Sequence, residues 1–242
     1  MIKISKRLHA LADMITEGAV LADVGTDHAY IPIYLLQTGR IPRAFARDIG
    51  RGPLLKAGEH VEAFGLGDYI TLRLSDGVAA LSTGEADSIL IAGMGGGVML
   101  HILEEGKEVI AAAKELILQP QSEIERVRKY IYKEGYIIDR ENMVLEDGKY
   151  YPMMHIVPGE AKEAPSAYSH EEWQVIYRYG EKLLQEKNQT LHQYLLYRTR
   201  QYEKILENLK NQQKETAEKR RKEIRTEMQY AKMALKNYRE VC

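Results

Sequence analysis

The chain has 242 residues, 45% of them hydrophobic and 29% charged, with a formal net charge of −1. This length suits one good-sized domain, or one domain with an appendage. No stretch approaches the roughly 20 apolar residues that span a bilayer. His9 and Asp13 interrupt the apolar residues near the N-terminus, so we expect no signal peptide. Cys242 is the only cysteine, which excludes an internal disulfide and a cysteine metal cluster, and we expect a cytoplasmic protein without a bound metal.

The first part of the chain alternates between strand-like and helix-like patterns. Short apolar runs predict strands at residues 20–24, 44–49, 70–74, 88–92 and 116–118, and helical spacing predicts helices at residues 32–37, 53–64, 98–104 and 123–134. Such alternation predicts a parallel sheet with crossover helices on both faces. For the last of these helices we expect a capping box, with Ser122 as the N-cap and Glu125 three residues later, and an end at Gly135.

Two further strand-like runs follow, at residues 136–145 and 150–157, with Asp147 and Gly148 between them. Asp-Gly between two such runs predicts a β-hairpin, so the parallel sheet should end in an antiparallel pair. This α/β layout resembles the Rossmann-like class I S-adenosylmethionine (SAM) methyltransferase fold. A plain dinucleotide-binding Rossmann domain would instead continue with a parallel strand.

The C-terminal part of the chain has a different pattern. Residues 158–168 contain two prolines and several alanines and predict a linker, so we expect one domain at residues 1–159 and another at residues 160–242. In the second domain we expect two long helices that form an antiparallel coiled-coil hairpin within one chain, with the reversal at residues 211–214 and with the protein a monomer. Apolar residues there recur at the alternating steps of three and four typical of a coiled-coil seam: Trp173, Ile176, Gly180, Leu184, Lys187, Leu191, Leu195, Tyr202, Ile205 and Leu209, then Ile224, Met228, Ala231, Leu235 and Tyr238.

Charge is distributed unevenly between the two parts. The first 159 residues carry five more acidic than basic side chains, and the rest carry four more basic than acidic ones. This asymmetry favours an anionic partner for the C-terminal part. Each basic group could equally be an ordinary solvated surface. The candidate groups are Lys3, Lys6 and Arg7; Arg40, Arg43, Arg47 and Arg51; and Lys219, Arg220, Arg221, Lys222 and Arg225.

Acidic residues follow three successive strands of the predicted sheet. Asp23 precedes Gly25, where the backbone can approach a ligand closely, and Asp48 at the next strand end suits a ribose diol. Asp76 could accept from an adenine amino group. Any one of these aspartates alone would more readily be a turn or helix cap, but three together favour a nucleoside site. NAD in place of SAM stays open, although the loop lacks the full G-x-G-x-x-G. The candidate cofactor residues are Asp23, Gly25, Asp48, Ile49, Asp76, Gly77 and Gly93.

The segment after the fourth strand has four glycines within residues 93–97. It could be a close-packing turn between strand and helix, or a floor on which a flat base lies opposite the cofactor. At the same sheet edge, Gln119 offers both a donor and an acceptor, and a capping role is equally consistent with its position. The candidate substrate residues here are Met94, Gly95, Gly96, Gln119 and Pro120.

Taken together, these motifs resemble those of the bacterial tRNA (adenine-22, N1)-methyltransferases. The resemblance spans the whole chain in order. Residues 23–32 (DVGTDHAYIP) and 91–96 (IAGMGG) are its distinctive pieces, whereas residues 46–49, 52–53, 75–77 and 116–120 are common to many methyltransferases. It implies methyl transfer from SAM to N1 of an adenine in the D-stem region of tRNA. N1 lies on the Watson–Crick edge, so the enzyme would act on an extruded base.

The resemblance leaves the roles in the loop after the first strand open. Asp27 could accept from the exocyclic amine of adenine and favour the positive charge that develops on the base; it could instead contact the SAM amino group or cap the following helix. His28 is a candidate donor to the cofactor carboxylate or a packing residue. Tyr30 could stack on the base or belong to the core. Lys6 and Arg7 are candidate contacts to the RNA.

Two other functions are compatible with the sequence. A methyltransferase of another substrate would be indifferent to the loss of residues 160–242. A non-catalytic RNA-binding or scaffold protein would not bind SAM.

Overall fold

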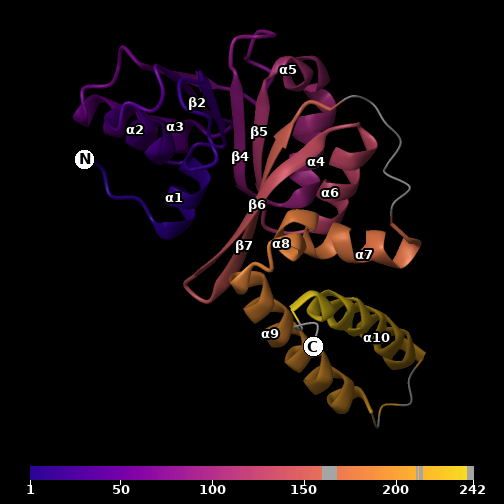
Figure 1. Cartoon of the computed structure of the whole chain (residues 1–242). Coiled ribbons are helices and arrows are strands. Elements are labelled where there is room, and N and C mark those ends of the chain that lie inside the picture. The colour runs from indigo at the N-terminus through magenta and orange to yellow at the C-terminus, as the bar shows by residue number, and fades with distance from the viewer. Residues whose placement is uncertain (160–167, 211, 213–214, 239–242) are drawn as a thin grey trace. The chain divides into compact units, whose positions relative to one another are not determined.

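The computed structural model describes residues 1–159, 168–210, 212 and 215–238. The chain forms two compact units, Met1–Ala164 and Pro165–Cys242. Figure 1 shows a sheet with helices in the first unit and helices alone in the second. Most of the expected linker, residues 158–168, lies outside the described residues.

The first unit contains a seven-stranded sheet with the strand order β3-β2-β1-β4-β5-β7-β6. The first five strands are parallel to one another, and β7 is antiparallel to both β5 and β6. The predicted fold class is therefore confirmed, including the terminal antiparallel pair. The strands are β1 (Leu21–Val24), β2 (Ala44–Asp48), β3 (Ile70–Leu74), β4 (Ser88–Met94), β5 (Glu115–Pro120), β6 (Ile137–Glu146) and β7 (Lys149–Val157).

Helices precede or connect most strands of this unit, although β3 is followed by β4 without a helix between them. The four predicted helices are present, and the short helix α5 after α4 was not predicted, because its six residues are too few to show a helical period. The helices are α1 (Lys6–Ala12), α2 (Tyr30–Gln37), α3 (Arg51–Ala63), α4 (Gly96–Glu105), α5 (Lys107–Ala112) and α6 (Ile124–Lys133).

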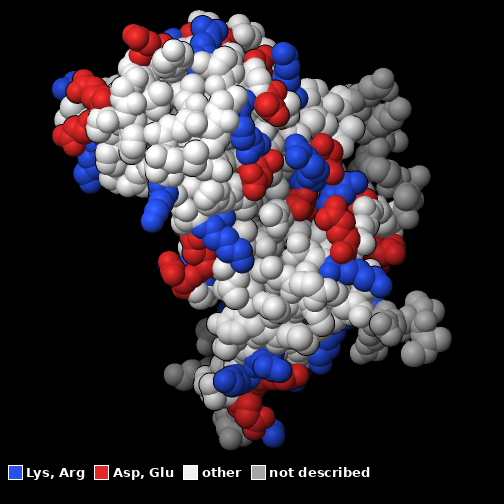
Figure 2. Space-filling model, turned by 60° about the vertical axis from the view of Figure 1, so that its left-hand side comes forward, with Lys and Arg blue, Asp and Glu red and all other residues white. Residues whose placement is uncertain are grey.

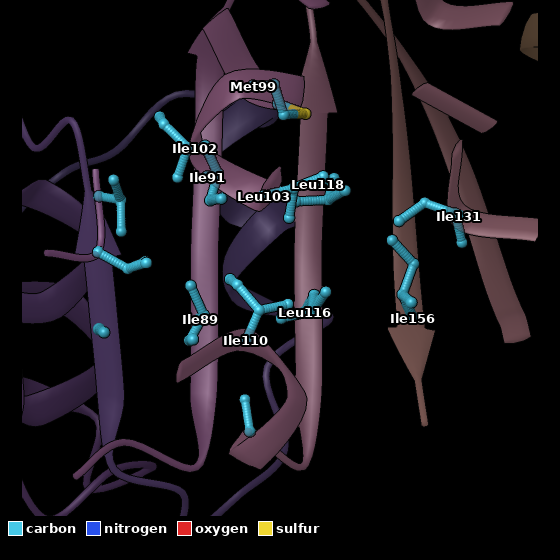
Figure 3. Packing of buried hydrophobic residues seen from close by; sticks show 14 of the residues in the cluster. Ile89, Ile91, Met99, Ile102, Leu103, Ile110, Leu116, Leu118, Ile131 and Ile156 are labelled. Carbon is cyan, nitrogen blue, oxygen red and sulfur yellow. The ribbon is translucent and has the colours of Figure 1, made fainter. Parts of the chain in front are cut away.

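Both faces of the sheet are buried, since successive residues of the central strands point to opposite sides. On one face, Ile89 and Leu116 belong to a cluster that includes Met99 of α4 and Ile131 of α6 (Figure 3). On the other face, Leu90 and Ile117 belong to a second cluster, together with residues of α1, α2 and α3. Continuous apolar strands covered on both sides are typical of parallel sheets.

The turns around α6 and the hairpin follow local backbone chemistry. Glu123, with a left-handed backbone (φ 51°, ψ 33°), is the N-cap of α6 and makes no side-chain cap bond, so the predicted capping box is wrong. The Ser122 hydroxyl instead accepts from the Gly96 backbone N–H at 3.3 Å. Gly135 follows the end of α6 with φ 80°, as predicted. Asp147 and Gly148 form the hairpin turn with φ values of 48° and 73°.

The second unit has four α-helices among its described residues. The first predicted long helix does not run without a break from residue 173, because the chain leaves the helical conformation at Gly180 (φ 88°) and at Lys187 (φ 51°). Asn188 then caps the next helix by accepting from the backbone N–H of Leu191 at 3.0 Å. The helices are α7 (His170–Tyr179), α8 (Glu181–Gln185), α9 (Gln189–Leu209) and α10 (Glu215–Leu235), with a 3-10 turn at Lys236–Tyr238.

Helices α9 and α10 pack against each other as the predicted antiparallel pair (Figure 1). At one end, Arg221 of α10 donates to the Leu209 carbonyl at 2.8 Å. At the other end, the Tyr238 hydroxyl donates to the Asn188 carbonyl at 3.0 Å. Three residues of the expected reversal at 211–214 lie outside the described residues. The predicted seam residues Leu191, Leu195, Tyr202, Ile224 and Ala231 are buried.

Candidate active site

A cavity of about 340 Å³ lies at the carboxyl ends of β1 and β4. The strand order reverses between these two strands, and ligands of open α/β sheets bind at such a point. The cavity brings together residues from α1, from the loop after β1, and from the end of β4. Its lining is Arg7, Leu8, Asp23, Gly25, Thr26, Asp27, His28, Ala29, Tyr30, Ile31, Ala92, Gly93 and Gln121.

Backbone hydrogen bonds to β2 hold the loop after β1 in place. The N–H groups of Gly25 and Thr26 both donate to the Arg47 carbonyl at 2.8 Å. The Thr26 hydroxyl accepts from the Ala29 N–H at 3.1 Å, which satisfies a free donor at the start of α2. Gly25 has φ 77°, and an added Cβ there would overlap the methyl group of Met94. Glycine is therefore required at residue 25 both by the backbone conformation and by the space.

Asp23 is the buried acid of the cavity, with 8% of its surface exposed. Burial, opposed by the hydrogen bond with Thr26 and aided by the nearby charge of Asp48, raises its pKa to about 6. A cationic group of a ligand beside this carboxylate would stabilise its charged form. Such a group would also satisfy an acceptor that burial has removed from water.

Three rings lie together where α2 begins. His28 and Tyr30 have ring centroids 4.9 Å apart with planes 13° apart, and His60 of α3 lies 5.1 Å from His28 and 5.4 Å from Tyr30. The His60 Nδ1 also lies 3.2 Å from the His28 carbonyl oxygen. The sequence pointed to the first two residues but not to His60, whose position depends on the packing of α3. The His28 Nδ1 is buried without a hydrogen-bond partner among the described residues.

Asp27 stands out from this loop, with 72% of its side chain exposed. Its carboxylate lies 3.3 Å from the His28 Nε2 and makes no other ion pair among the described residues. The N-cap of α2 is Ala29 in a left-handed conformation (φ 54°), without a side-chain cap bond, so Asp27 does not cap that helix. Its carboxylate is available to a ligand in the cavity.

Arg7 is the only lysine or arginine in the lining of the cavity. Its Nη1 donates to the Gln119 Oε1 at 2.9 Å, and its guanidinium lies 5.2 Å from the centroid of the Tyr151 ring. Gln119 is fully buried, and its Nε2 donates to the Pro120 carbonyl at 3.2 Å. Because both ends of its amide are engaged, Gln119 supports Arg7 instead of lining the cavity. Lys6 is exposed and does not line the cavity.

The glycines after β4 serve different purposes. Gly93 lies in the cavity wall at an irregularity of β4, with φ 79°. Gly96 donates to the Ser122 carbonyl at 3.1 Å, and an added Cβ there would lie 2.5 Å from that oxygen. Close packing therefore accounts for Gly96. Met94, Gly95 and Gly96 lie beside the cavity but not in its lining.

The remaining candidate cofactor residues lie at the same sheet edge, beyond the cavity lining. The Asp48 Oδ1 accepts from the Gly50 N–H at 2.6 Å, and its carbonyl accepts from the Ser75 N–H at 2.9 Å. Ile49 is 70% exposed. Asp76 is exposed, and Gly77 has φ 49°. The loops after β2 and β3 are thus connected directly to each other.

The candidate basic residues differ in their surroundings. Arg47 is fully buried, so its assignment to a basic patch is wrong, and Arg40 pairs with Asp13 at 3.0 Å. On α10, Arg220 pairs with Glu223 at 3.0 Å. Figure 2 shows one face of the molecule, on which basic and acidic side chains are interspersed. The exposed cations of the run on α10 without an ion pair among the described residues are Lys219, Lys222 and Arg225.

The strand order, the acidic loops and the cavity at the point where that order reverses define a Rossmann-like methyltransferase. The model of the methyltransferase domain family matches residues 4–154. A tRNA (adenine(22)-N(1))-methyltransferase of Bacillus subtilis is 42% identical over 167 residues, which are 69% of each chain. The chain belongs to this family of tRNA (adenine-22, N1)-methyltransferases.

Solved structures agree with this assignment. The structure of the Bacillus subtilis m1A22 tRNA methyltransferase TrmK has a TM-score of 0.85 at 34% identity, over 97% of this chain and 100% of that one. The Streptococcus pneumoniae protein Sp1610 in complex with S-adenosyl-L-methionine has a TM-score of 0.82 at 34% identity, over 96% and 100% of the chains. TrmK of M. capricolum in complex with S-adenosyl-homocysteine has a TM-score of 0.81 at 27% identity, over 98% and 99%.

Among the described residues, no helix has both the length and the apolar character to cross a membrane. The same residues contain no group of three or more His, Cys, Asp or Glu side chains that could hold a metal ion.

Proposed function

We propose that this protein transfers the methyl group of SAM to N1 of adenine 22 in tRNA. The observation that carries the proposal is the 42% identity, over 69% of each chain, to a Bacillus subtilis enzyme that bears the name of this reaction. The methyltransferase family model covers residues 4–154, which include every residue of the cavity lining.

The residues of the sheet edge fit SAM. The buried Asp23 suits the cationic amino-acid end, and Arg7 and the unpartnered His28 Nδ1 can donate to the carboxylate at that end. Gly25 and Gly93 both lie in the lining, and neither places a side chain in the cavity. Beyond the cavity, we assign Asp48 to the ribose diol, and Ile49, Asp76 and Gly77 to the adenine end. When bound, SAM supplies an electrophilic methyl group on a sulfonium.

The acceptor atom needs alignment more than activation. N1 of adenine carries its own lone pair, so no strong base is required, and the protein has to orient the base and stabilise the positive charge that develops on it. We assign the exposed carboxylate of Asp27 to the exocyclic amine, where accepting a hydrogen bond would hold the base and favour that charge. Tyr30, in the same lining, offers a ring for the base to stack on. Extrusion of the base costs about a few kcal/mol.

Contacts to the rest of the tRNA are assigned to basic side chains of both units. Lys6 and Arg7 lie at the start of α1, beside the cavity, and Met94, Gly95 and Gly96 border it. In the second unit, Lys219, Lys222 and Arg225 of α10 supply exposed cations for phosphates. We infer that the α9–α10 pair forms within one chain and that the protein acts as a monomer in the cytoplasm, where its tRNA substrate resides.

The test is methylation of a defined tRNA. Purified protein is incubated with unmodified transcript and radioactive SAM, and the modified base is mapped by the block that N1-methyladenine imposes on reverse transcription. We expect one block at adenine 22, absent from a transcript with guanine at that position. Label at another site, or none despite measurable SAM binding, would overturn the proposed acceptor.

A further inference from the structure

Arg47, at the end of β2, is a buried cation that connects two loops of the cofactor edge. Its side chain is completely inaccessible to solvent. Its backbone carbonyl accepts from the N–H groups of Gly25 and Thr26, both at 2.8 Å, in the loop after β1. The main chain of Arg47 therefore holds the loop after β1.

The guanidinium of the same residue holds the loop after β3. Its Nη2 donates to the Gly77 carbonyl and to the Ser75 hydroxyl, the latter at 3.4 Å, and its Nη1 donates to the Val78 carbonyl at 3.5 Å. The Ser75 hydroxyl in turn accepts from the Ala80 N–H at 3.1 Å. The guanidinium thus holds loop 75–78, which carries two of the proposed adenine contacts, against the strand that ends in Asp48.

The stability of the fold does not explain this arrangement. Burial, together with the charge of Arg73, lowers the pKa of Arg47 to about 10, because the charged form is less favoured there than in water. Glu85, the acid whose charge opposes this shift, is engaged by Arg73 through two hydrogen bonds of 2.6 Å. The Arg47 Nε is buried and has no partner among the described residues. An apolar side chain of similar size would avoid these costs, although it would leave the Gly77 and Val78 carbonyls without this donor.

We propose that Arg47 is a positioning residue for the nucleoside end of SAM, which fixes loop 75–78 at the distance from Asp48 that the ribose and adenine require. The proposal rests on the use of SAM by this protein. It assigns a role in cofactor affinity to a side chain that touches no ligand itself.

Arg47→Met tests the proposal, because methionine fills a similar volume without charge or hydrogen bonds. We expect SAM affinity, measured by titration calorimetry, to fall about tenfold, which is the low end of the loss when groups that orient metal ligands are removed. The thermal midpoint should fall, because the Gly77 and Val78 carbonyls lose this donor, but by no more than it falls in the control variant described below. In steady-state assays KM for SAM should rise while KM for tRNA stays unchanged. Wild-type SAM affinity in Arg47→Met would overturn the proposal.

Arg128→Met provides the matched control. Arg128 is also fully buried, and its Nη2 pairs with Glu141 at 2.8 Å, away from the cofactor edge. Its replacement should lower the thermal midpoint and leave SAM affinity unchanged in the folded protein. If both variants lost SAM affinity in proportion to lost stability, Arg47 would be a structural residue only.

Two further measurements keep the outcomes separate. Arg47→Lys retains the charge but lacks the forked donors, so its SAM affinity should lie between those of wild type and Arg47→Met. If the methionine variant does not fold, a loss of SAM affinity in the lysine variant tests the same proposal. If wild-type protein binds SAM but leaves tRNA unmethylated, the proposed acceptor is wrong, and the calorimetric titrations still decide the role of Arg47.

Discussion

Asp27 is an acid that the fold itself does not use. It is largely exposed, it does not cap α2, and its single ion-pair neighbour among the described residues is His28. Asp23, four residues earlier, is buried and connected to Thr26. The two carboxylates of this loop thus have different environments, so we expect them to bind different groups of the ligands.

If Asp27 serves the target base, Asp27→Ala should lower turnover about a hundredfold, the loss typical for removal of one group that stabilises a developing charge. SAM affinity should change by less than about twofold, since the cofactor would keep its own contacts. Single-turnover methylation and calorimetry measure the two quantities. Asp13→Ala, a change of another exposed acid of the same unit, is the control. A large loss of SAM affinity would instead assign Asp27 to the cofactor.

The residues of the site differ in how well the sequence could predict them. Asp23, Gly25 and Asp48 follow predicted strands, so their meeting at one edge follows from parallel topology alone. Burial of Arg47 and the approach of His60 to the rings of α2 depend on contacts between distant segments. A pattern of single residues along the chain contains no information about such contacts.

At the scale of elements, a charged cluster connects β5 and the terminal hairpin. His155 of β7 is buried, its Nε2 lies 2.8 Å from the Glu115 Oε2, and its Nδ1 bonds to Asp139. The Thr16 hydroxyl donates to the same Glu115 oxygen at 2.5 Å. Burial alone would lower the pKa of His155, but the bonds to the two carboxylates outweigh it and raise that pKa above 6.5.

This cluster predicts a loss of stability in alkali. A raised folded-state pKa of His155 contributes stability fully below pH 6.5, and the contribution is lost as pH rises through the folded value. His155→Gln should lower the free energy of unfolding at pH 6 by about 2 kcal/mol, the contribution of a hydrogen bond between charged groups, and flatten its pH dependence above pH 6.5. Urea unfolding between pH 6 and 9 measures this. The exposed His101→Gln should behave as wild type; an unchanged pH profile in His155→Gln would contradict the prediction.

The acid side of the profile follows from Glu115. Burial raises its pKa, but the bonds from His155 and Thr16 prevail and lower it to about 2. A lowered pKa contributes stability that is present above about pH 4.5 and is lost as pH falls toward 2.

Helices, strands and turns were predicted correctly where one local sequence pattern determines the structure. The predictions were wrong where a second interaction competes with that pattern. The strands and the Asp147–Gly148 turn follow from runs and turn chemistry. The coiled-coil spacing continues across Gly180 and Lys187, yet the backbone turns at both, since periodicity does not report backbone angles. Ser122 stands at a position typical of a helix cap, but its hydroxyl accepts from the backbone N–H of Gly96 in another helix.

At the scale of the whole molecule, the two units carry opposite net charges and contain separate buried cores. The cavity residues all belong to the first unit, and the exposed cations of α10 belong to the second. The proposed division of labour is cofactor binding and chemistry in the first, and phosphate contacts in the second.

Removal of residues 165–242 should therefore separate the two activities. We expect SAM affinity within about twofold of the full chain, and tRNA methylation at low substrate reduced by at least about tenfold, with a weaker dependence on salt. Full-length protein with Lys219, Lys222 and Arg225 changed to Ala should show part of the same loss with the fold intact. Undiminished methylation by the shortened chain would indicate an acceptor that the second unit does not contact.

The contact between Met94 and Gly25 has a consequence for how this protein family varies. A side chain at residue 25 meets two obstacles, the methyl group of Met94 and the positive φ, whereas Met94 itself has only to fit beside a glycine. Shortening residue 94 removes the first obstacle and leaves the second. Across an alignment of relatives we therefore expect different side chains at position 94 over an unchanging glycine at position 25, and not exchange at both positions together.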